Sequence, residues 1–284
     1  MGRFASMSVA LPTSVDEVVD LLVRNPSATL LAGGTDLMVE VNLHGRRPTD
    51  VVALNRVAEL RTWSVDSSRR TVTIGSGVPY AEMETGELAR LLPALAEAAR
   101  TVGSPQIRAA GTLGGNLGTC SPAGDGLPVL AALEASIDVV GPNGSRQVHF
   151  ADFMVGVKRN SLRPSEFVRS VTFPLNDGWQ GYAKVGTRNA MVIATASVCL
   201  VRTNDHVAVA LGAVGPTIIR ANGAEAWLAA NHRMSSPPSN DTLAEFGRLV
   251  REASRPIDDH RSTAAYRRHA VGVLAQRLLT RSYS

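Results

Sequence analysis

The 284-residue chain contains little cysteine, few aromatic residues and almost no lysine. Its two cysteines, Cys120 and Cys199, are too few for a disulfide framework, a zinc site or an iron–sulfur site on their own. Only Lys158 and Lys184 are lysines, and the many arginines are scattered. A nucleic-acid-binding protein is expected to show a basic stripe with stacking aromatic residues, and aromatic residues make up only 5% of this chain. We therefore attribute the net charge of +4 to a bias in amino-acid composition rather than to a binding surface, and we expect no nucleic-acid partner.

Long apolar runs and targeting signals are also lacking. No run approaches the ~20 apolar residues that cross a bilayer, so we expect no membrane span. Residues 1–6 (MGRFAS) match the loose pattern for N-myristoylation, but nothing before the first predicted helix adds a second anchor. Asp16 and Glu17 interrupt the apolar region that a signal peptide needs. We expect a cytoplasmic protein.

The common catalytic motifs are missing. The chain has no Gly-Lys pair for a phosphate loop and no GxSxG motif. The dinucleotide-binding motif GxGxxG is not matched around Gly115, because Leu113 occupies the position of its first glycine. The six histidines show no metal-ligand spacing. These absences argue against a P-loop ATPase, a hydrolase with a nucleophile elbow and a zinc enzyme. We predict no catalytic and no metal-binding residue in this chain.

The composition permits a sizeable core, since 44% of the residues are apolar and 19% are charged. At roughly 150 residues per domain, the length suggests two domains. Strand and helix patterns alternate up to a boundary near Asn176, and residues 88–102 read as one helix. Beyond the boundary, strands are expected at residues 181–185, 192–201 and 207–214, and three helices follow. Strands followed by helices are typical of a small α+β domain.

Two glycine-rich segments stand out, and the first of them spans residues 32–37 (AGGTDL). It follows a short apolar strand and precedes a predicted helix. Glycines let the backbone approach a ligand closely, and successive free N–H groups can bind an anion. The start of a helix adds a favourable dipole. A tight strand-to-helix turn without a ligand explains this segment equally well.

The second segment covers residues 111–118 and continues through Ser121 to Asp125. Four glycines in eight residues cost more backbone entropy than a turn requires, and we predict neither helix nor regular strand there. Thr112, Asn116 and Ser121 add hydrogen-bonding side chains, and Asp125 can accept hydrogen bonds from ribose or ribityl hydroxyls. Together the two segments favour a dinucleotide site over two structural turns.

Three stretches in this order, LLAGGTDL (30–37), TVGSPQIRAAGTLGGNLGTCSPAGD (101–125) and AKVGTRNAM (183–191), resemble the FAD-binding subunit of molybdenum hydroxylases. Residues 212–228 and 256–279 resemble that family's C-terminal domain, so the resemblance covers nearly the whole chain. It implies an α+β, two-subdomain FAD-binding fold of the PCMH type over residues 1–176, divided into 1–56 and 57–176. Residues 177–284 would form a small three-stranded sheet with helices, as in the carbon monoxide dehydrogenase flavoprotein.

The resemblance also implies the residues that bind the cofactor. The first segment would hold the FAD pyrophosphate, and Lys184 would lie near the flavin. No histidine lies in either segment, so we expect FAD to be bound non-covalently. The predicted cofactor-binding residues are Leu31, Ala32, Gly33, Gly34, Thr35, Asp36, Leu37, Val102, Gly111, Thr112, Gly114, Gly115, Asn116, Ser121, Asp125, Val168 and Lys184.

Simpler explanations remain open for several residues. Val102 and Val168 fit an ordinary core as well as a flavin contact, and Lys184 could be a solvated strand residue. Cys120 is better explained as a small buried residue than as a redox thiol. Tyr266 and the arginines that follow it suggest helix packing or a subunit contact rather than catalysis.

The resemblance implies the medium subunit of a three-subunit oxidoreductase. A large subunit would oxidise substrate at molybdopterin, and [2Fe–2S] clusters of a small subunit would pass electrons to FAD, which reduces NAD⁺ or O₂. Molybdopterin and the clusters are expected only on the partner subunits, in a dimer of heterotrimers. The SPAGD segment favours a purine or other N-heteroaromatic substrate over the carbon monoxide type. The alternatives are a stand-alone FAD oxidoreductase and a non-catalytic nucleotide-binding or assembly module.

Overall fold

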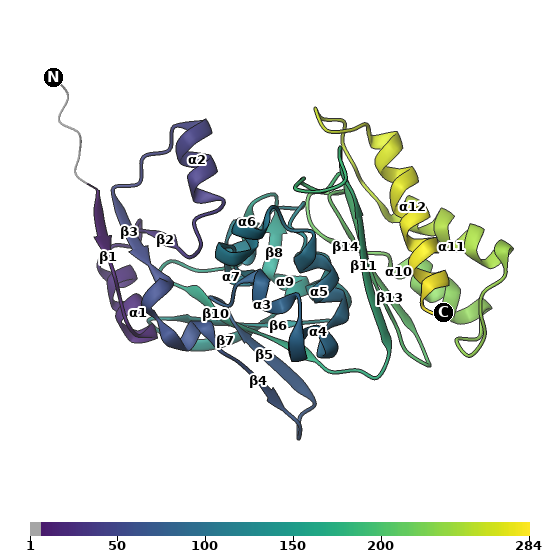
Figure 1. Ribbon diagram of the computed structural model, residues 1–284, viewed down its shortest axis with the longest axis horizontal. Coiled ribbons are helices and arrows are strands. Elements are labelled where there is room, and N and C mark those ends of the chain that lie inside the picture. The colour runs from purple at the N-terminus through teal and green to yellow at the C-terminus, as the bar shows by residue number, and fades with distance from the viewer. Residues whose placement is uncertain (1–6) are drawn as a thin grey trace.

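The structure is a computed structural model that describes residues 7–284. The myristoylation pattern of residues 1–6 lies outside the described residues. Three lobes follow one another along the long axis of the molecule, in the order of the sequence (Figure 1). Within the described range, no helix is long and apolar enough to cross a membrane.

The first lobe is built on a parallel sheet with the strand order β1-β3-β2. Helix α1 begins after Ser14, whose hydroxyl accepts the N–H of Glu17, and it buries Val15, Val18 and Leu22. Such a side-chain cap satisfies one of the free N–H groups at a helix start. The elements are β1 (Ser8–Ala10), α1 (Val15–Arg24), β2 (Thr29–Leu31), α2 (Leu37–His44), β3 (Asp50–Ala53), η1 (Leu54–Arg56) and η2 (Ala58–Arg61).

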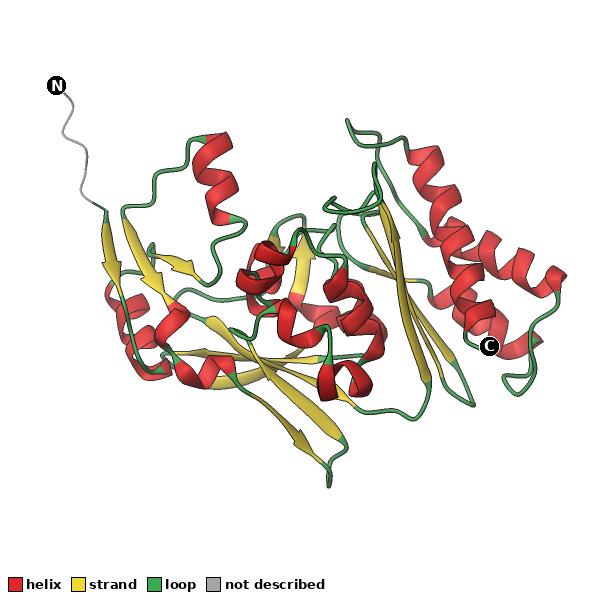
Figure 2. Cartoon of the chain, viewed as in Figure 1, coloured by secondary structure: helices red, strands yellow, loops and turns green. Residues whose placement is uncertain are grey.

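The second lobe contains an antiparallel five-stranded sheet with the order β4-β5-β10-β6-β7. Short helices lie over this sheet (Figure 2). Its strands are β4 (Trp63–Asp66), β5 (Thr71–Gly75), β6 (Ser136–Gly141), β7 (Gly144–His149) and β10 (Phe167–Pro174), and β8 (Met154–Gly156) pairs with β9 (Arg159–Asn160) outside it. Its helices are α3 (Tyr80–Met83), α4 (Gly86–Leu91), α5 (Pro93–Arg100), α6 (Pro105–Ala110), α7 (Leu113–Thr119), α8 (Leu127–Ala132) and α9 (Phe150–Phe153).

Two sequence expectations in this lobe are wrong. The single helix expected over residues 88–102 is divided into α4 and α5, because Pro93 disfavours the helical conformation at Leu92. The segment expected to be too glycine-rich for a helix contains α7. Leu113 and Leu117 lie one turn apart on that helix and are fully buried, and their burial offsets the poor helix propensity of the glycines.

The third lobe is an antiparallel sheet with the order β11-β12-β13-β14 and three helices. The expectation of three strands omits β14, a two-residue strand that pairs with β13. Strand β12 also starts later than expected, because residues 186–195 form a loop between β11 and β12. The elements are β11 (Trp179–Val185), β12 (Ala196–Arg202), β13 (Val207–Gly212), β14 (Ile219–Arg220), α10 (Asn222–Asn231), α11 (Asn240–Ala253) and α12 (Ala264–Arg281).

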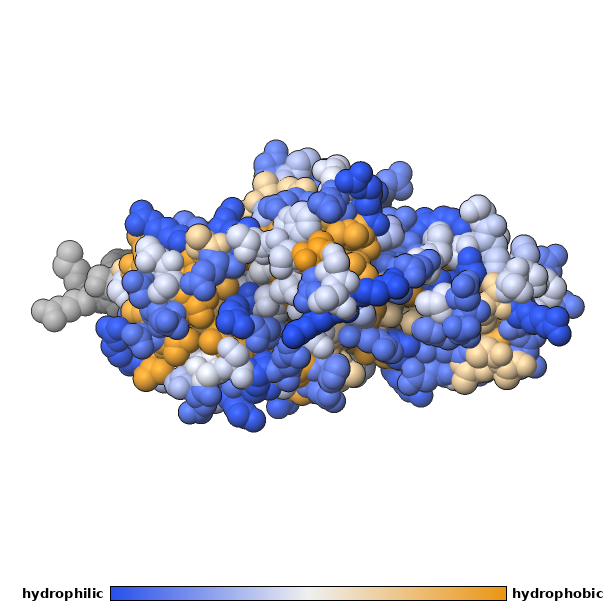
Figure 3. Space-filling model, turned by 90° about the horizontal axis from the view of Figure 1, so that it is seen from below, coloured by the Kyte–Doolittle hydropathy of each residue, from blue (hydrophilic) through white to orange (hydrophobic). Residues whose placement is uncertain are grey.

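Helices from two lobes cover the two faces of this last sheet. Helices α10 and α12 pack on one face, and α5 and α8 of the second lobe pack on the other (Figure 1). Tyr182 and Cys199 therefore belong to the core of the second lobe although they lie in β11 and β12. The surface seen in Figure 3 shows hydrophobic residues in separate groups among hydrophilic ones. The packing places β11 directly against α5 of the second lobe.

Arg267 of α12 is a buried arginine that joins three segments of the third lobe. Only 4% of its surface is exposed. Its guanidinium group donates to the carbonyl oxygens of Thr195 (2.9 Å) and Ala213 (2.8 Å) and to Asp259 (2.6 Å). These contacts agree with a helix-packing role for this arginine.

We expect Arg267→Met to lower the free energy of unfolding by about 3 kcal/mol, because it leaves buried carbonyls and a carboxylate without their donor. The neighbouring Arg268 is exposed, and Arg268→Met should change the stability by less than about 0.5 kcal/mol. Denaturant unfolding of both variants measures the difference. Equal losses would show that the buried contacts of Arg267 contribute nothing specific.

Candidate cofactor site

The two glycine-rich segments lie against each other. A Cβ atom added to Gly33 would stand 1.8 Å from the carbonyl oxygen of Ala110 and 3.0 Å from the backbone nitrogen of Gly111. The hydroxyl of Thr119, at the end of α7, donates to the carboxylate of Asp36 at 2.7 Å. The structure therefore brings the two segments to one place, although they come from different lobes.

The first segment presents free backbone donors. Between β2 and α2, the N–H groups of Gly33, Gly34, Thr35 and Asp36 donate to no backbone carbonyl of residues 7–284. Gly34 has a φ of 73°, in the left-handed region that glycine adopts without strain. Successive unpaired N–H groups in such a turn form a concave site that suits an anion such as a pyrophosphate.

The second segment contains the start of α7, which packs against the loop after β5. Thr112 caps the helix by accepting the N–H of Gly115 at 2.9 Å. Gly114 donates to the carbonyl of Ser76, and a Cβ at Gly114 would lie 2.4 Å from the Cβ of Ser76. Gly111 accepts the N–H of Tyr80 at 3.0 Å. Glycine at position 114 is therefore required by the close approach of another segment, and the backbone of position 111 is held by Tyr80.

Several buried polar atoms next to this segment have no partner among the described residues. They include the hydroxyl of Tyr80, the side-chain oxygen of Asn116 and the hydroxyl of Ser76. The first two lie within 3.0 and 3.2 Å of the position that a Cβ of Gly126 would take. Buried polar atoms are normally hydrogen-bonded, so these atoms fit a bound ligand that carries hydroxyl and phosphate groups. The residues present thus fit a dinucleotide such as FAD.

Tyr80 is a candidate site residue that the sequence analysis missed. Burial raises the pKa of its phenol well above the ordinary value, so the hydroxyl stays a neutral donor at physiological pH. A tyrosine at the start of a short helix carries no sequence signal of its own. Only the unpartnered hydroxyl beside Asn116 identifies it.

A buried ion pair connects the second lobe with the third lobe. The ammonium group of Lys184 donates to Asp125 at 2.7 Å, and the two side chains are only 8% and 9% exposed. The Tyr182 hydroxyl donates to the other oxygen of Asp125 at 2.8 Å. Burial raises the pKa of Asp125, and the charge of Lys184 and the hydrogen bonds from Lys184 and Tyr182 oppose that rise. The structure thus joins two predicted residues that lie 59 positions apart.

The chain matches two known protein families in sequence. The family described as the FAD binding domain in molybdopterin dehydrogenase matches residues 5–176, and the CO dehydrogenase flavoprotein C-terminal domain matches residues 182–282. The chain belongs to this family of FAD-binding subunits. The expected α+β fold, with an FAD-binding domain followed by that C-terminal domain, is confirmed, and so is FAD as the cofactor.

Relatives match this flavin subunit over nearly its full length. The xanthine dehydrogenase FAD-binding subunit of Escherichia coli O157:H7 is 29% identical over 99% of the chain and 96% of the relative. The carbon monoxide dehydrogenase medium chain of Hydrogenophaga pseudoflava is 31% identical over 96% of both chains. A solved structure of carbon monoxide dehydrogenase from the same organism matches with a TM-score of 0.89 and 28% identity, over 98% of this chain and 97% of that one. The flavin subunit is thus an oxidoreductase subunit.

Three further predicted residues of the flavin subunit lie in different surroundings. Ser121 forms a local turn, since its hydroxyl accepts the N–H of Ala123 at 3.3 Å. Val102 is half-buried and directly follows Thr101, whose carbonyl binds Lys184. Val168 is 6% exposed and packs in the main core as part of β10. The positions of Val102 and Ser121 suit a cofactor contact better than that of Val168.

Cys120 ends α7 in a left-handed conformation, with a φ of 51°. Its side chain is fully buried, and burial raises the pKa of the thiol to about 11. The thiolate is the reactive form of cysteine, so a thiol that stays protonated at neutral pH is a poor redox group. The structure supports the interpretation of Cys120 as a small buried residue.

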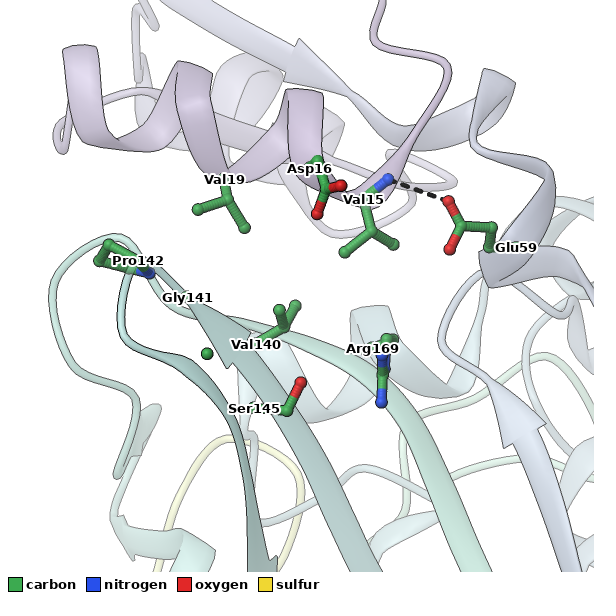
Figure 4. Close-up of a pocket in the computed structure, with 10 residues that line it drawn as sticks. Val15, Asp16, Val19, Glu59, Val140, Gly141, Pro142, Ser145 and Arg169 are labelled. Carbon is green, nitrogen blue, oxygen red and sulfur yellow. Dashed lines mark hydrogen bonds between the residues drawn. The ribbon is translucent and has the colours of Figure 1, made fainter.

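An open cavity of about 410 Å³ lies away from the glycine segments, between α1 and the β6–β7 hairpin (Figure 4). Two of its polar side chains already have partners, since Glu59 accepts the N–H of Val15 and Arg169 pairs with Asp138. None of the predicted cofactor residues lines it. Elsewhere in residues 7–284, no group of three or more His, Cys, Asp or Glu side chains is arranged to hold a metal ion.

We expect Gly33→Ala to remove most of the bound flavin. The added methyl group would collide with the backbone carbonyl of Ala110, which cannot rotate away as a side chain does, so the two segments must separate. The visible flavin absorbance per chain measures the occupancy, and circular dichroism reports the fold.

Gly223→Ala is the matched control, because nothing lies within 4 Å of a Cβ at Gly223 in α10. That variant should keep its full flavin content. Unchanged flavin occupancy in Gly33→Ala would contradict the placement of the cofactor at the contact between the segments.

Proposed function

We propose that the chain is the flavin subunit of a three-subunit molybdenum hydroxylase. FAD held by this chain would supply the redox chemistry between the [2Fe–2S] clusters of a small subunit and NAD⁺ or O₂ as the electron acceptor. The partners are that small subunit and a molybdopterin-binding large subunit, in a dimer of heterotrimers and in the cytoplasm. The observation that supports the cofactor site is the contact of Gly33 with the Ala110 carbonyl, beside the buried pair of Asp125 and Lys184.

The residues of this chain bind and orient the cofactor rather than perform acid–base or nucleophilic steps. The free N–H groups of residues 33–36 would hold the pyrophosphate. Asp125 would accept hydrogen bonds from hydroxyl groups of the flavin's polar chain, and the Tyr80 hydroxyl and Asn116 would bind in the same region. A flavin protein needs no further catalytic group, because the isoalloxazine carries the chemistry.

The partner subunits are supported by the composition of the chain. Two cysteines cannot provide the four ligands of an iron–sulfur cluster, so electrons must reach the flavin from outside this chain. The similarity to a xanthine dehydrogenase subunit and the SPAGD segment support a purine or another N-heteroaromatic substrate, bound by the large subunit. The similarity to a carbon monoxide dehydrogenase medium chain supports the carbon monoxide type as the second candidate.

Purification of the tagged chain from its native host tests the assembly. We expect two further subunits, molybdenum and iron to copurify with it, and we expect the flavin of the complex to be reduced by a purine or related heteroaromatic compound. Metal analysis and the bleaching of flavin absorbance are the measurements. A preparation without molybdenum and iron would contradict the assembly, and steady turnover of a small substrate by the isolated chain would favour a stand-alone oxidoreductase.

A further inference from the structure

The ammonium group of Lys184 has no donor left for a ligand. It donates to the carbonyl oxygen of Thr101 at 2.8 Å, to Asp125 at 2.7 Å and to the carbonyl oxygen of Val192 at 3.0 Å. A lysine ammonium group has three N–H donors, so these acceptors use all of them. The side chain is also only 8% exposed.

The acceptors of Lys184 come from three separate segments. Thr101 follows α5, Asp125 precedes α8, and Val192 lies in the loop between β11 and β12. Lys184 itself lies in β11, so one nitrogen atom connects two segments of the FAD-binding domain with two of the C-terminal domain. Residues that touch this group are therefore fixed relative to one another.

Asp125, in contrast to Lys184, keeps free hydrogen-bond acceptor positions for a ligand. Each of its two carboxylate oxygens accepts one hydrogen bond from the protein, from Tyr182 and Lys184. A carboxylate oxygen can accept two, so one position remains on each oxygen. The hydroxyl groups of a polyol are suitable donors for these positions.

The loop after β11 depends on the same lysine. Gly186 packs against Val192, since a Cβ at Gly186 would lie 2.3 Å from a methyl carbon of Val192. Met191 has a φ of 51°, which is unfavourable for a residue with a side chain, and its side chain is half exposed. The bond from Lys184 to the Val192 carbonyl lies beside this strained position and holds it.

We propose that Lys184 is a positioning residue, which holds Asp125, the end of α5 and the loop after β11 in one arrangement and makes no hydrogen bond to the flavin. The proposal rests on the proposed function in one respect, namely that FAD occupies this site. It assigns the direct contact with the flavin's hydroxyl groups to Asp125, and the role of Lys184 is to keep Asp125 ionised and oriented.

The consequence for Asp125 is electrostatic. The titratable groups around it are Lys184 and Tyr182 of β11 and Tyr80 of α3, and Glu97 of α5 accepts the backbone N–H of Tyr182. Lys184 is the only cation among these groups. Without it, burial would favour the neutral acid, and the pKa of Asp125 would rise further.

The FAD affinity of Lys184→Met, measured against pH by fluorescence titration of the full chain, tests this role. We expect an affinity loss of about ten-fold or more at neutral pH. The affinity should then rise with pH as Asp125 ionises, because a carboxylate accepts hydroxyl hydrogen bonds more strongly than a neutral acid does. The double variant Lys184→Met/Asp125→Asn should lose this pH dependence, and Lys184→Arg, which keeps the charge, should restore the flat profile of the wild type.

Lys158→Met is the matched control, because Lys158 pairs with Glu40 on the surface at 2.8 Å and is 58% exposed. It should bind FAD as the wild type does. A Lys184→Met profile that parallels the wild type, or a pH dependence that persists in the double variant, would overturn the proposal. A wild-type chain that binds no FAD would instead contradict the proposed function.

Acetylation of the wild-type chain gives a test that does not depend on folding of a variant. The chain has only two lysines, so peptide mass spectrometry follows both. We expect Lys158 to react and Lys184 to resist, with and without FAD, because the protein already occupies every N–H of Lys184. A Lys184 that reacts in the flavin-free chain and is protected by FAD would overturn the proposal.

Discussion

The backbone contact between Gly33 and Ala110 is the constraint on which the site depends. It joins a turn of the parallel-sheet lobe to a turn of the antiparallel lobe, at a separation that no Cβ atom could share. Glycine at such a position costs roughly 0.5–1 kcal/mol of backbone entropy relative to alanine. That cost is acceptable because the absence of a side chain lets the two segments meet beside the free N–H groups of residues 33–36. The packing of the lobes thus determines where a pyrophosphate can bind.

The C-terminal domain completes the arrangement by ionic and hydrogen-bonded contacts in addition to the packing of its sheet against α5 and α8. Glu97 of α5 accepts the backbone N–H of Tyr182 at 2.7 Å and pairs with Arg281 of α12 at 2.6 Å. These contacts fix α5 between β11 and the last helix, and α5 in turn leads to Thr101 and the Lys184 cluster. The proposed cofactor site is therefore shared between the two domains, and neither of them contains all of its polar groups.

The sequence predicted the parts of the site that have a local signature. Glycine-rich segments are visible as composition, and their convergence was expected from the need to hold one ligand. Helix α7 was not expected, because glycine content suggested a loop and the burial of Leu113 and Leu117 is a tertiary effect. Tyr80 was missed because an unpartnered hydroxyl exists only in three dimensions. The sequence also does not show that all three N–H donors of Lys184 have acceptors within the protein. Two of these acceptors are backbone carbonyls, which any residue could supply.

The charges around the site are already neutralised within the protein, and this determines how the cofactor is recognised. Lys184 pairs with Asp125, and Arg108 of α6 pairs with Glu84. Apart from the free acceptor positions of Asp125, the groups left open are neutral dipoles, namely backbone N–H groups, a phenol and an amide oxygen. Such dipoles bind a phosphate at a fixed geometry, whereas free cations would attract any polyanion at longer range. Recognition by shape would explain why an arginine-rich chain carries glycines, and not arginines, in the segments that we propose to hold the negative charge of the cofactor.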